Sequence, residues 1–413
     1  MIHFEQHTLA NGLKVIVHQD KTSPLAIVNT LYKVGARDEQ PDKTGFAHLF
    51  EHFMFEGSVN IPEFDTPLQL AGGENNAFTN NDITNYYDLL PAGNLETAFW
   101  LESDRMLSLN FEEQSLETQK KVVMEEFKEH YINQPYGDVW HKISELAYKV
   151  HPYRWPTIGK ELSHIEKVTM EDFKQFFFHY YRPNNATLVV AGNVEANKVF
   201  SLAEKWFGNI PRGAKEVVRA IPAEPMQTSK RTEEVYAQVP VNAIYKTWRM
   251  CARNHQDYYA TDLLRDILST GDSSRLFRKL VKEQKLFSSI ASFLSETIDE
   301  GLFFVEGKLN EGVSMEQAEN AINEVVHELA AETIQEQELT KVKNKMESLL
   351  AFSDTNVLNR AMNLAFADML GNVNGVNEDI EHYRNVTAAQ LRQTAASVFK
   401  EEQSCVLKYY ARN

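Results

Sequence analysis

The sequence has almost no cysteine. Cys251 and Cys405 are the only cysteines among its 413 residues. Two thiols cannot build a disulfide framework or a thiolate-rich zinc site, and so few cysteines fit a reducing compartment. The chain is therefore neither a small domain stabilised by several disulfides nor a zinc module whose ligands are mainly cysteines.

The chain also lacks a surplus of positive charge. Its formal net charge is −16, whereas proteins that bind nucleic acid through phosphates need a basic surface. The charge therefore argues against a nucleic-acid partner. With 43% apolar and 24% charged residues, the composition is that of an ordinary globular protein. The length favours two domains of roughly 200 residues each.

Long hydrophobic runs are absent as well. No stretch approaches the roughly 18 consecutive apolar residues of a transmembrane helix. The first residues, MIHFEQHTLANGLKVIVHQD, lack the basic segment and apolar core of a signal peptide. We expect a cytoplasmic protein without a membrane span, or a periplasmic one if a leader has been removed.

The order of predicted elements favours an α+β fold over a doubly wound parallel sheet. Asn11-Gly12 lies between two alternating segments and predicts a β-hairpin with a two-residue turn. Further strands are predicted at 25–36 and 186–194, and helices at 44–58, 94–109 and 112–133.

A break in the pattern divides the chain. Residues 211–232 contain three prolines, mixed charge and no sustained periodicity, which is typical of an interdomain linker. We predict an N-terminal domain at 1–210 and a C-terminal domain at 233–413. Each is expected to be a mostly antiparallel sheet packed with helices.

The pattern recurs after the linker. Residues 261–280 predict a helix, and 287–309 match the strand pair of the first half. Aligned by eye, HLFEH at 48–52 falls on DLLRD at 262–266. We therefore predict two homologous copies of one unit. The second copy keeps the helix without the histidines, so folding does not require them, and their presence in the first copy has a chemical reason.

One segment, TGFAHLFEHFMFEGS at 44–58, combines apolar character with titratable side chains. His48 and His52 are four residues apart, so their rings share one helical face and can converge on one point. Glu51 lies near the edge of that face. Unpaired titratable groups are costly in such an apolar segment. A bound cation would satisfy them, and internally hydrogen-bonded core histidines are the alternative.

His-x-x-Glu-His is the inverted form of the His-Glu-x-x-His zinc helix. A catalytic zinc ion usually has three protein ligands and an open position for water. It lowers the pKa of that water to about 7, and a nearby carboxylate can accept the proton. His48 and His52 supply two ligands, and Glu51 supplies the carboxylate. We expect the third ligand to be a carboxylate from a neighbouring helix.

The segment SLETQKKVVMEEFKEHYINQPYGDVW at 115–140 is the candidate donor of that ligand. Glu126 lies beside its predicted buried stripe, whereas Glu125 and Glu129 are expected to face solvent. The alternative for Glu126 is a surface carboxylate that pairs with nearby lysines. The predicted stripe comprises Val122, Val123, Phe127 and Tyr131.

With these residues the chain resembles the pitrilysin, insulysin and mitochondrial processing peptidase family of zinc endopeptidases. HLFEH is followed after 73 residues by the second glutamate of VVMEEF. GGENNAFTNNDITNYY and ESDRM resemble the family's next segments, and the likeness covers nearly the whole chain. The resemblance implies one zinc ion held by His48, His52 and Glu126, with Glu51 as general base.

The resemblance also implies a mode of substrate binding. Asn76, Ala77 and Phe78 would lie on an exposed strand edge that pairs with the backbone of an extended peptide. From the residues alone, Asn76 is equally well a turn or strand-end residue that follows Gly72-Gly73.

The chain departs from the family pattern at two places. A supporting glutamate often precedes the third ligand by seven residues, where this chain has Gln119, so the support of the ligands is expected to be weaker or rearranged. Active assemblies also use an Arg and a Tyr, seven residues apart, to hold the substrate carbonyl. Here those positions are Val281 and Ser288, or Leu280 and Phe287 after a one-residue shift. Losing one such donor costs about 10²–10³ in rate.

The sequence thus predicts a zinc endopeptidase that acts on peptides or unfolded polypeptide segments. It would be the catalytic subunit of a heterodimer with an Arg/Tyr-bearing homologue, and a homodimer is the other assembly considered. Mn²⁺ or Co²⁺ also suit this ligand set in vitro. The alternative function is a noncatalytic peptide-binding or assembly subunit, although such subunits usually have a degraded zinc motif.

Overall fold

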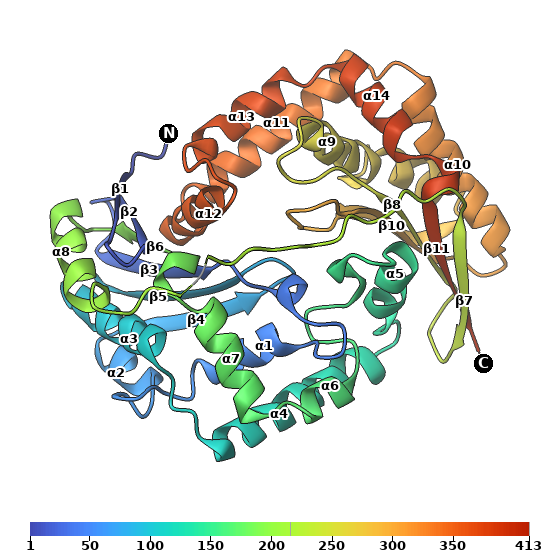
Figure 1. Cartoon of the computed structure of the whole chain (residues 1–413). Coiled ribbons are helices and arrows are strands. Elements are labelled where there is room, and N and C mark those ends of the chain that lie inside the picture. Colours follow the sequence, from blue (N-terminus) through green and yellow to red (C-terminus); the bar gives the residue numbers. More distant parts are fainter. Residues whose placement is uncertain (215, 413) are drawn as a thin grey trace. The chain divides into compact units, whose positions relative to one another are not determined.

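The computed structural model describes residues 1–214 and 216–412 (Figure 1). Their contacts divide the chain into two compact units that are interleaved along the sequence. Each unit contains one β-sheet covered by helices, which confirms the predicted α+β class. Unit 1 comprises Met1–Lys128, Trp155–Ile221 and Ala351–Glu378, and unit 2 comprises Glu129–Arg154, Pro222–Leu350 and Asp379–Asn413.

The sheet of unit 1 has six strands in the order β1-β2-β6-β3-β5-β4. Neighbouring strands are antiparallel, except for the parallel pair β2 and β6. β4 therefore forms one edge of the sheet. The strands are β1 (Glu5–Thr8), β2 (Lys14–Gln19), β3 (Leu25–Tyr32), β4 (Glu74–Thr79), β5 (Thr84–Pro91) and β6 (Ala186–Gly192).

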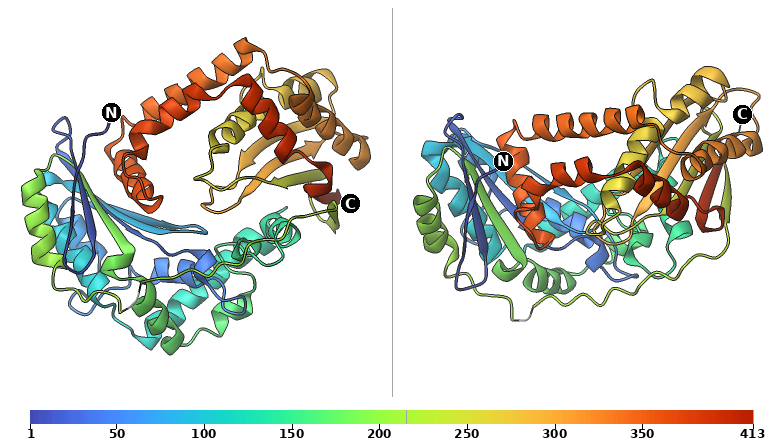
Figure 2. Two further views of the ribbon diagram at one scale, coloured as in Figure 1. Left: turned by 45° about the horizontal axis from the view of Figure 1, so that its top comes forward. Right: turned by 90° about the horizontal axis from the view of Figure 1, so that it is seen from above.

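Helices α3 and α8 cover one face of this sheet, and α12 covers the other (Figure 2). The alternation of side chains along β3 explains the two faces. Thr30 donates a hydrogen bond to Glu102 of α3, whereas Ile27 and Leu31 pack in a cluster with Leu364 of α12. The helices of unit 1 are α1 (Phe46–Phe53), α2 (Asp65–Leu70), α3 (Leu95–Leu107), α4 (Glu113–Phe127), α6 (Leu162–Glu166), α7 (Met170–Tyr180), α8 (Ala196–Phe207) and α12 (Val357–Met369).

The sheet of unit 2 has five strands in the order β7-β11-β8-β10-β9. β7 and β11 are parallel, and the other neighbouring pairs are antiparallel. Both the order and the pairing directions repeat those of β2-β6-β3-β5-β4, which supports the predicted homology of the two halves. The strands are β7 (Arg231–Ala237), β8 (Ala243–Arg249), β9 (Phe287–Leu294), β10 (Leu302–Leu309) and β11 (Ser404–Ala411).

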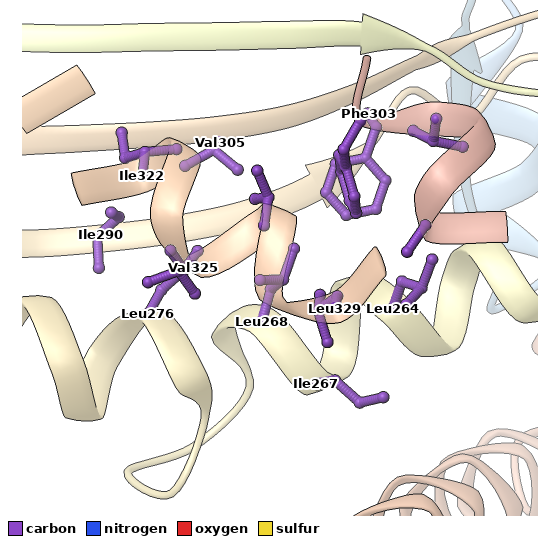
Figure 3. Packing of buried hydrophobic residues seen from close by; sticks show 14 of the residues in the cluster. Leu264, Ile267, Leu268, Leu276, Ile290, Phe303, Val305, Ile322, Val325 and Leu329 are labelled. Carbon is purple, nitrogen blue, oxygen red and sulfur yellow. The ribbon is translucent and has the colours of Figure 1, made fainter. Parts of the chain in front are cut away.

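A hydrophobic core joins one face of the unit 2 sheet to α9, α10 and α14 (Figure 3). Leu264 and Leu268 of α9 and Val325 of α10 pack in this core with Phe303 and Val305 of β10. Full burial of each such side chain contributes about 1.5–3 kcal/mol. The remaining helices are α5 (Val139–Ala147), α9 (Tyr258–Ser269), α10 (Met315–Ala331), α11 (Glu336–Ser353), α13 (Gly375–Asn385) and α14 (Ala388–Val398).

One helix of each unit comes from the other half of the sequence. Ile143 of α5 packs with Tyr245 on the second face of the unit 2 sheet, and α12 covers unit 1. The packing units therefore differ from the predicted ranges 1–210 and 233–413 at these two segments. An amphipathic pattern shows that a helix has a buried side, but it does not show which sheet covers that side.

The predicted linker, 211–232, is bonded to both units. Arg219 lies 2.6 Å from the carboxylate of Asp38 in unit 1. Glu224 accepts hydrogen bonds of 2.7–3.0 Å from three successive backbone N–H groups of unit 2. The last residues of the predicted linker already belong to β7. Side chains of this segment are therefore bonded to the unit beside them on both sides of the boundary.

The first hairpin forms as predicted, but its turn is longer. A backbone hydrogen bond from Leu9 to Leu13 (2.9 Å) encloses three residues instead of two. Gly12 occupies the left-handed region with φ at 92°, as a three-residue hairpin loop requires. Asn11 donates its side-chain amide to the carbonyl of Phe207 at 2.8 Å. The asparagine thus anchors the hairpin to α8, a tertiary role that local sequence does not reveal.

Candidate metal centre

Helix α1 has a buried side and a more accessible side. Phe50 stacks on Phe173 of α7, with their ring centroids 3.7 Å apart. The accessible side carries His48, Glu51 and His52. Packing on α7 therefore fixes the helix and leaves its three titratable groups on the opposite side. The buried residues of α1 are Phe46, Ala47, Leu49, Phe50 and Phe53.

The two histidines and Glu126 of α4 lie together. The Glu126 Oε2 atom is 3.8 Å from Nε2 of His48 and 3.4 Å from Nε2 of His52. All three potential ligand atoms lie within 4.8 Å of one another. Zinc binds histidine nitrogen and carboxylate oxygen at about 2.0–2.2 Å, so an ion between these atoms needs only small side-chain movements. The residues fit a zinc ion.

Burial changes the pKa values of two side chains at this site, His48 and Glu51. Burial and the neighbouring His52 lower the pKa of His48 to about 3, so that imidazole is neutral at physiological pH and can act as a ligand. The Nδ1 atom of His48 is buried and has no hydrogen-bond partner among the described residues. Burial raises the pKa of Glu51, and Thr79 of β4 and His52 oppose that shift.

Helix α4 presents Glu126 as predicted, but its buried side is narrower. The side chain of Glu126 is 35% exposed, whereas that of Glu125 is 73% exposed and pairs with Lys128. Val123 and Phe127 are buried. Val122 is 39% exposed, so its place in the predicted stripe was wrong. It lies about 100° around the helix from the buried Val123, which takes its side chain to the edge of the buried side.

Gln119 lies on the same helix but does not contact the ligands. Its amide donates a hydrogen bond to Glu56, which lies just beyond α1. The bond ties α4, which carries Glu126, to the segment that follows the two histidines. Its role as a support of the ligands therefore remains a prediction, with a bridge between the two ligand-bearing segments as its geometric basis.

The predicted substrate edge lies beside this centre. Asn76, Ala77 and Phe78 belong to β4, the edge strand that packs on α1. The Ala77 N–H donates to the side-chain oxygen of Asn76 at 2.8 Å. That donor is therefore satisfied within its own strand.

The ESDRM motif at 102–106 supports the turn after α1. Arg105 is buried and forms an ion pair with Glu102 on the same helix. Its guanidinium carbon lies 4.3 Å from the ring centroid of Phe64 and 5.6 Å from that of Phe55. These cation–π contacts hold the chain where it leaves the helix.

Two residues near the site were missed by sequence reasoning. Thr79 contacts Glu51, and Glu39 binds the first turn of α1 through the N–H groups of Gly45 and Ala47. Burial raises the pKa of Glu39, and the N–H groups of Ala47 and Gly45 oppose that shift because they stabilise the carboxylate form. The local sequence gives no signal that the Glu39 side chain binds the start of a helix six residues further on.

Comparison with known proteins places the chain in a family. A model described as insulinase (peptidase family M16) matches residues 14–161, and one described as the peptidase M16 inactive domain matches residues 167–346. The zinc protease PqqE of Helicobacter pylori is 32% identical over 412 residues, which cover 97% of this chain and 91% of that protein. The chain belongs to peptidase family M16.

Further relatives agree with this family. The uncharacterized zinc protease YmxG of Bacillus subtilis is 25% identical, with 98% of this chain and 97% of that protein covered. A crystal structure of a protease from Helicobacter pylori superposes with a TM-score of 0.92 at 30% identity and covers 99% of this chain and 100% of that chain. The names of the relatives support a peptidase. Within residues 1–214 and 216–412, no helix has the length and apolarity to cross a membrane.

Proposed function

We propose that this M16 protein is a zinc-dependent endopeptidase that hydrolyses peptides or unfolded polypeptide segments. The convergence of His48, His52 and Glu126 carries the proposal, because their ligand atoms form the one His/Cys/Asp/Glu group of metal-binding geometry found in the described chain. One zinc ion would be held by these three side chains. Glu51 would be the general base.

A bound zinc ion supplies Lewis acidity and lowers the pKa of a coordinated water to about 7. Glu51 would accept a proton from the attacking water and return it to the amine that leaves. Burial raises the pKa of Glu51, which makes its carboxylate a stronger base than an exposed one. General acid–base catalysis of this kind contributes about 10²–10⁴ in rate.

The edge strand β4 supports binding of substrate in extended form. Peptides that add a strand to a sheet edge gain affinity from main-chain hydrogen bonds and specificity from alternate side chains. Asn76, Ala77 and Phe78 offer such an edge, and Thr79 at its end contacts Glu51. A substrate paired with β4 would therefore pass the proposed base.

The residues of unit 2 at the positions of the family's Arg and Tyr support the proposal that a partner chain is needed. Ser288 is exposed on β9, and Val281 is half-buried, whereas Leu280 and Phe287 are core residues. The unshifted pair, Val281 and Ser288, therefore lies at accessible positions, as residues that hold a substrate must. Neither the unshifted nor the shifted pair contains the family's Arg or Tyr. Arg275 is bound to Glu338 at 2.7 Å. We propose that an Arg/Tyr-bearing homologue completes the active assembly.

The decisive experiment compares the wild-type chain with Glu51→Gln, each loaded with zinc and mixed with unstructured peptides. We expect one zinc ion per chain in both proteins. Activity is expected to be weak for the chain alone and to rise when the native partner is added. In the Glu51→Gln variant it should fall by about 10²–10⁴.

Other outcomes separate the remaining possibilities. Cleavage by the chain alone at full rate would argue against the heterodimer, as would a native complex whose mass shows only this chain. Zinc binding without cleavage in any complex would favour the noncatalytic peptide-binding subunit. A wild-type chain that binds no zinc would overturn the proposed metal centre.

A further inference from the structure

The helix that carries the proposed ligands has no capping side chain at its start. Its N-cap residue, Gly45, has φ at 88°, in the region that favours glycine. A Cβ atom at this position would lie 2.7 Å from the carbonyl oxygen of Ile158. The N-cap position therefore cannot hold the Ser, Thr, Asp or Asn that usually satisfies the first N–H groups of a helix.

The neighbouring Thr44 cannot take over that task. Its hydroxyl lies 2.8 Å from Nδ1 of His164 and accepts a hydrogen bond from the N–H of Lys160 at 2.7 Å. The hydroxyl is thus engaged with α6 and with Lys160 just before that helix. Another group must satisfy the first N–H groups of α1.

Glu39 provides that group from a distance of six to eight residues. One oxygen accepts from the N–H of Gly45 at 2.9 Å, and the other accepts from the N–H of Ala47 at 2.9 Å. The side chain is only 7% exposed, so water competes little for these bonds. A carboxylate at this end also interacts favourably with the helix dipole.

The loop that carries Glu39 is itself fixed. Arg37 forms a buried ion pair of 2.9 Å with Asp82. Asp38 is paired with Arg219 and accepts a hydrogen bond from the N–H of Gly35. Glu39 therefore holds the first turn of α1 against a rigid support. His48 directly follows the last residue that this carboxylate binds.

We propose that Glu39 is a positioning residue for the metal centre, which sets the placement of His48 by holding the first turn of α1. The inference rests on the proposed zinc site. An eight-residue helix is too short to be stable by its own propensity, so its first turn depends on the carboxylate. Without it, His48 loses its fixed distance from His52 and Glu126.

The test measures zinc affinity by competition with a chromophoric chelator, using the full chain and its Glu39→Gln variant. An amide at this position keeps one acceptor and turns an N–H donor towards a backbone N–H. We expect zinc binding to weaken by about 10- to 100-fold, the range found when groups that orient ligands are removed. The absorption spectrum of the Co²⁺-loaded variant should also change, because it reports ligand geometry.

Glu63→Gln is the matched control. Glu63 accepts the N–H of Thr66 at 3.1 Å at the start of α2, a helix without ligands. Its removal should leave both zinc affinity and the Co²⁺ spectrum unchanged. If Glu39→Gln does not fold, Glu39→Asp carries the test, since it keeps the charge but is too short to bind both N–H groups, and we expect it to bind zinc more weakly than the wild type.

The outcomes separate this inference from the proposed function. A wild-type chain without zinc affinity would end the proposed function. A wild-type chain that binds zinc, together with a folded Glu39 variant of equal affinity and spectrum, would overturn only the positioning role. Weaker binding in the Glu39 variant and normal binding in Glu63→Gln would support it.

Discussion

The corresponding helices α1 and α9 serve different purposes in the two units. In unit 1, α1 packs on the edge strand β4, and in unit 2, α9 packs on the corresponding edge strand β9. His48, Glu51 and His52 of α1 align with Asp262, Arg265 and Asp266 of α9. The three residues of α1 include no arginine or lysine and could bind a cation. The three residues of α9 include the positively charged Arg265.

The contacts in unit 2 show how the position is filled. The Arg265 guanidinium lies 2.8 Å from Asp262 and 3.0 Å from Asp266. Lys345 of α11 lies 3.1 Å from Asp266, whereas α4 brings Glu126 to the histidines of unit 1. Tyr383 donates to Asp262 at 2.6 Å. Two cationic side chains thus neutralise the acids of α9 without a metal.

The comparison teaches that one scaffold accepts either charge arrangement. Both units share a helix whose apolar side packs against the unit and whose polar side carries charges that need a partner. In unit 1 the polar side lacks a cation of its own, and in unit 2 Arg265 provides one. The difference can therefore be tested by exchanging residues between the helices.

The largest effect is expected when α1 receives the residues of α9. His48→Asp, Glu51→Arg and His52→Asp together replace two ligands and the proposed base. Zinc affinity should fall by more than about 10³-fold, because coordination supplies about 10–16 kcal/mol in structural zinc sites. Metal analysis after dialysis would measure the loss.

The fold should survive this exchange. The apolar side of α1, including Phe50, is unchanged, so the metal-free melting temperature is expected to stay close to that of the metal-free wild type. A triple variant that loses its circular dichroism signal would show that the histidines are needed for folding. It would contradict the lesson drawn from α9.

The second effect concerns the cation of unit 2. Arg265→Ala leaves Asp262 and the fully buried Asp266 with less compensation. Removing one partner of a buried pair costs about 3–5 kcal/mol, and the remaining Lys345 places the expected loss near the lower end. Urea denaturation at neutral pH would measure it.

An exposed arginine provides the control for this change. Arg278 pairs with Glu283 at 3.7 Å, and both side chains are more than half exposed. Arg278→Ala should change the unfolding free energy by less than about 1 kcal/mol. Equal losses in the two variants would show that the Asp262–Arg265–Asp266 arrangement contributes no more than a surface pair.

The comparison also shows what the sequence could predict. The spacing of His48 and His52 follows from helix geometry, so the sequence predicted their convergence, and the structure places them together. The strand pairs and the repeat were predicted from alternation and turn residues. These features are local, or they repeat a local pattern at a fixed separation.

Features that depend on distant partners could not be predicted in the same way. Nothing near Gly45 in the sequence shows that Glu39 replaces its cap, and nothing around Asn11 shows its bond to Phe207. The turn of the first hairpin and the sheet that α5 covers have the same cause. Each depends on tertiary contacts that periodicity does not encode.

Acid should lower the stability of unit 2 through Glu319, a buried carboxylate on α10. Burial alone would raise the pKa of Glu319, but hydrogen bonds from Lys230 and Lys408 lower it to about 2. The folded pKa lies below the unfolded value, so the stabilisation is complete above about pH 4.5 and is lost as the pH falls towards 2. The loss amounts to about 2–3 kcal/mol.

Urea titrations between pH 2 and pH 6 would test this expectation. Glu319→Gln should be less stable than the wild type at neutral pH, and the two proteins should approach each other at low pH. A constant difference across the whole range would mean that the charge of Glu319 contributes nothing and that only its packing matters.

The smallest effect should come from the bridge between α1 and α4. The Gln119 amide donates a hydrogen bond to Glu56. Gln119→Glu would place two carboxylates together. We expect a loss of about 1 kcal/mol at pH 7, because like charges at close range oppose ionisation. Zinc affinity should weaken several-fold, since the bridge joins the two ligand-bearing segments.

Lower pH should reverse the effect of Gln119→Glu. Near pH 4.5 the two carboxyls can share one proton, which restores a hydrogen bond between Glu56 and residue 119. The difference in unfolding free energy between variant and wild type should therefore shrink as the pH falls from 7 to 4.5. Gln114→Glu is the matched control, since this exposed residue lies on the same helix and its backbone carbonyl, not its side chain, bonds to Thr118. If both variants behaved alike at every pH, the Gln119–Glu56 contact would have no part in holding α4 to the helix of the histidines.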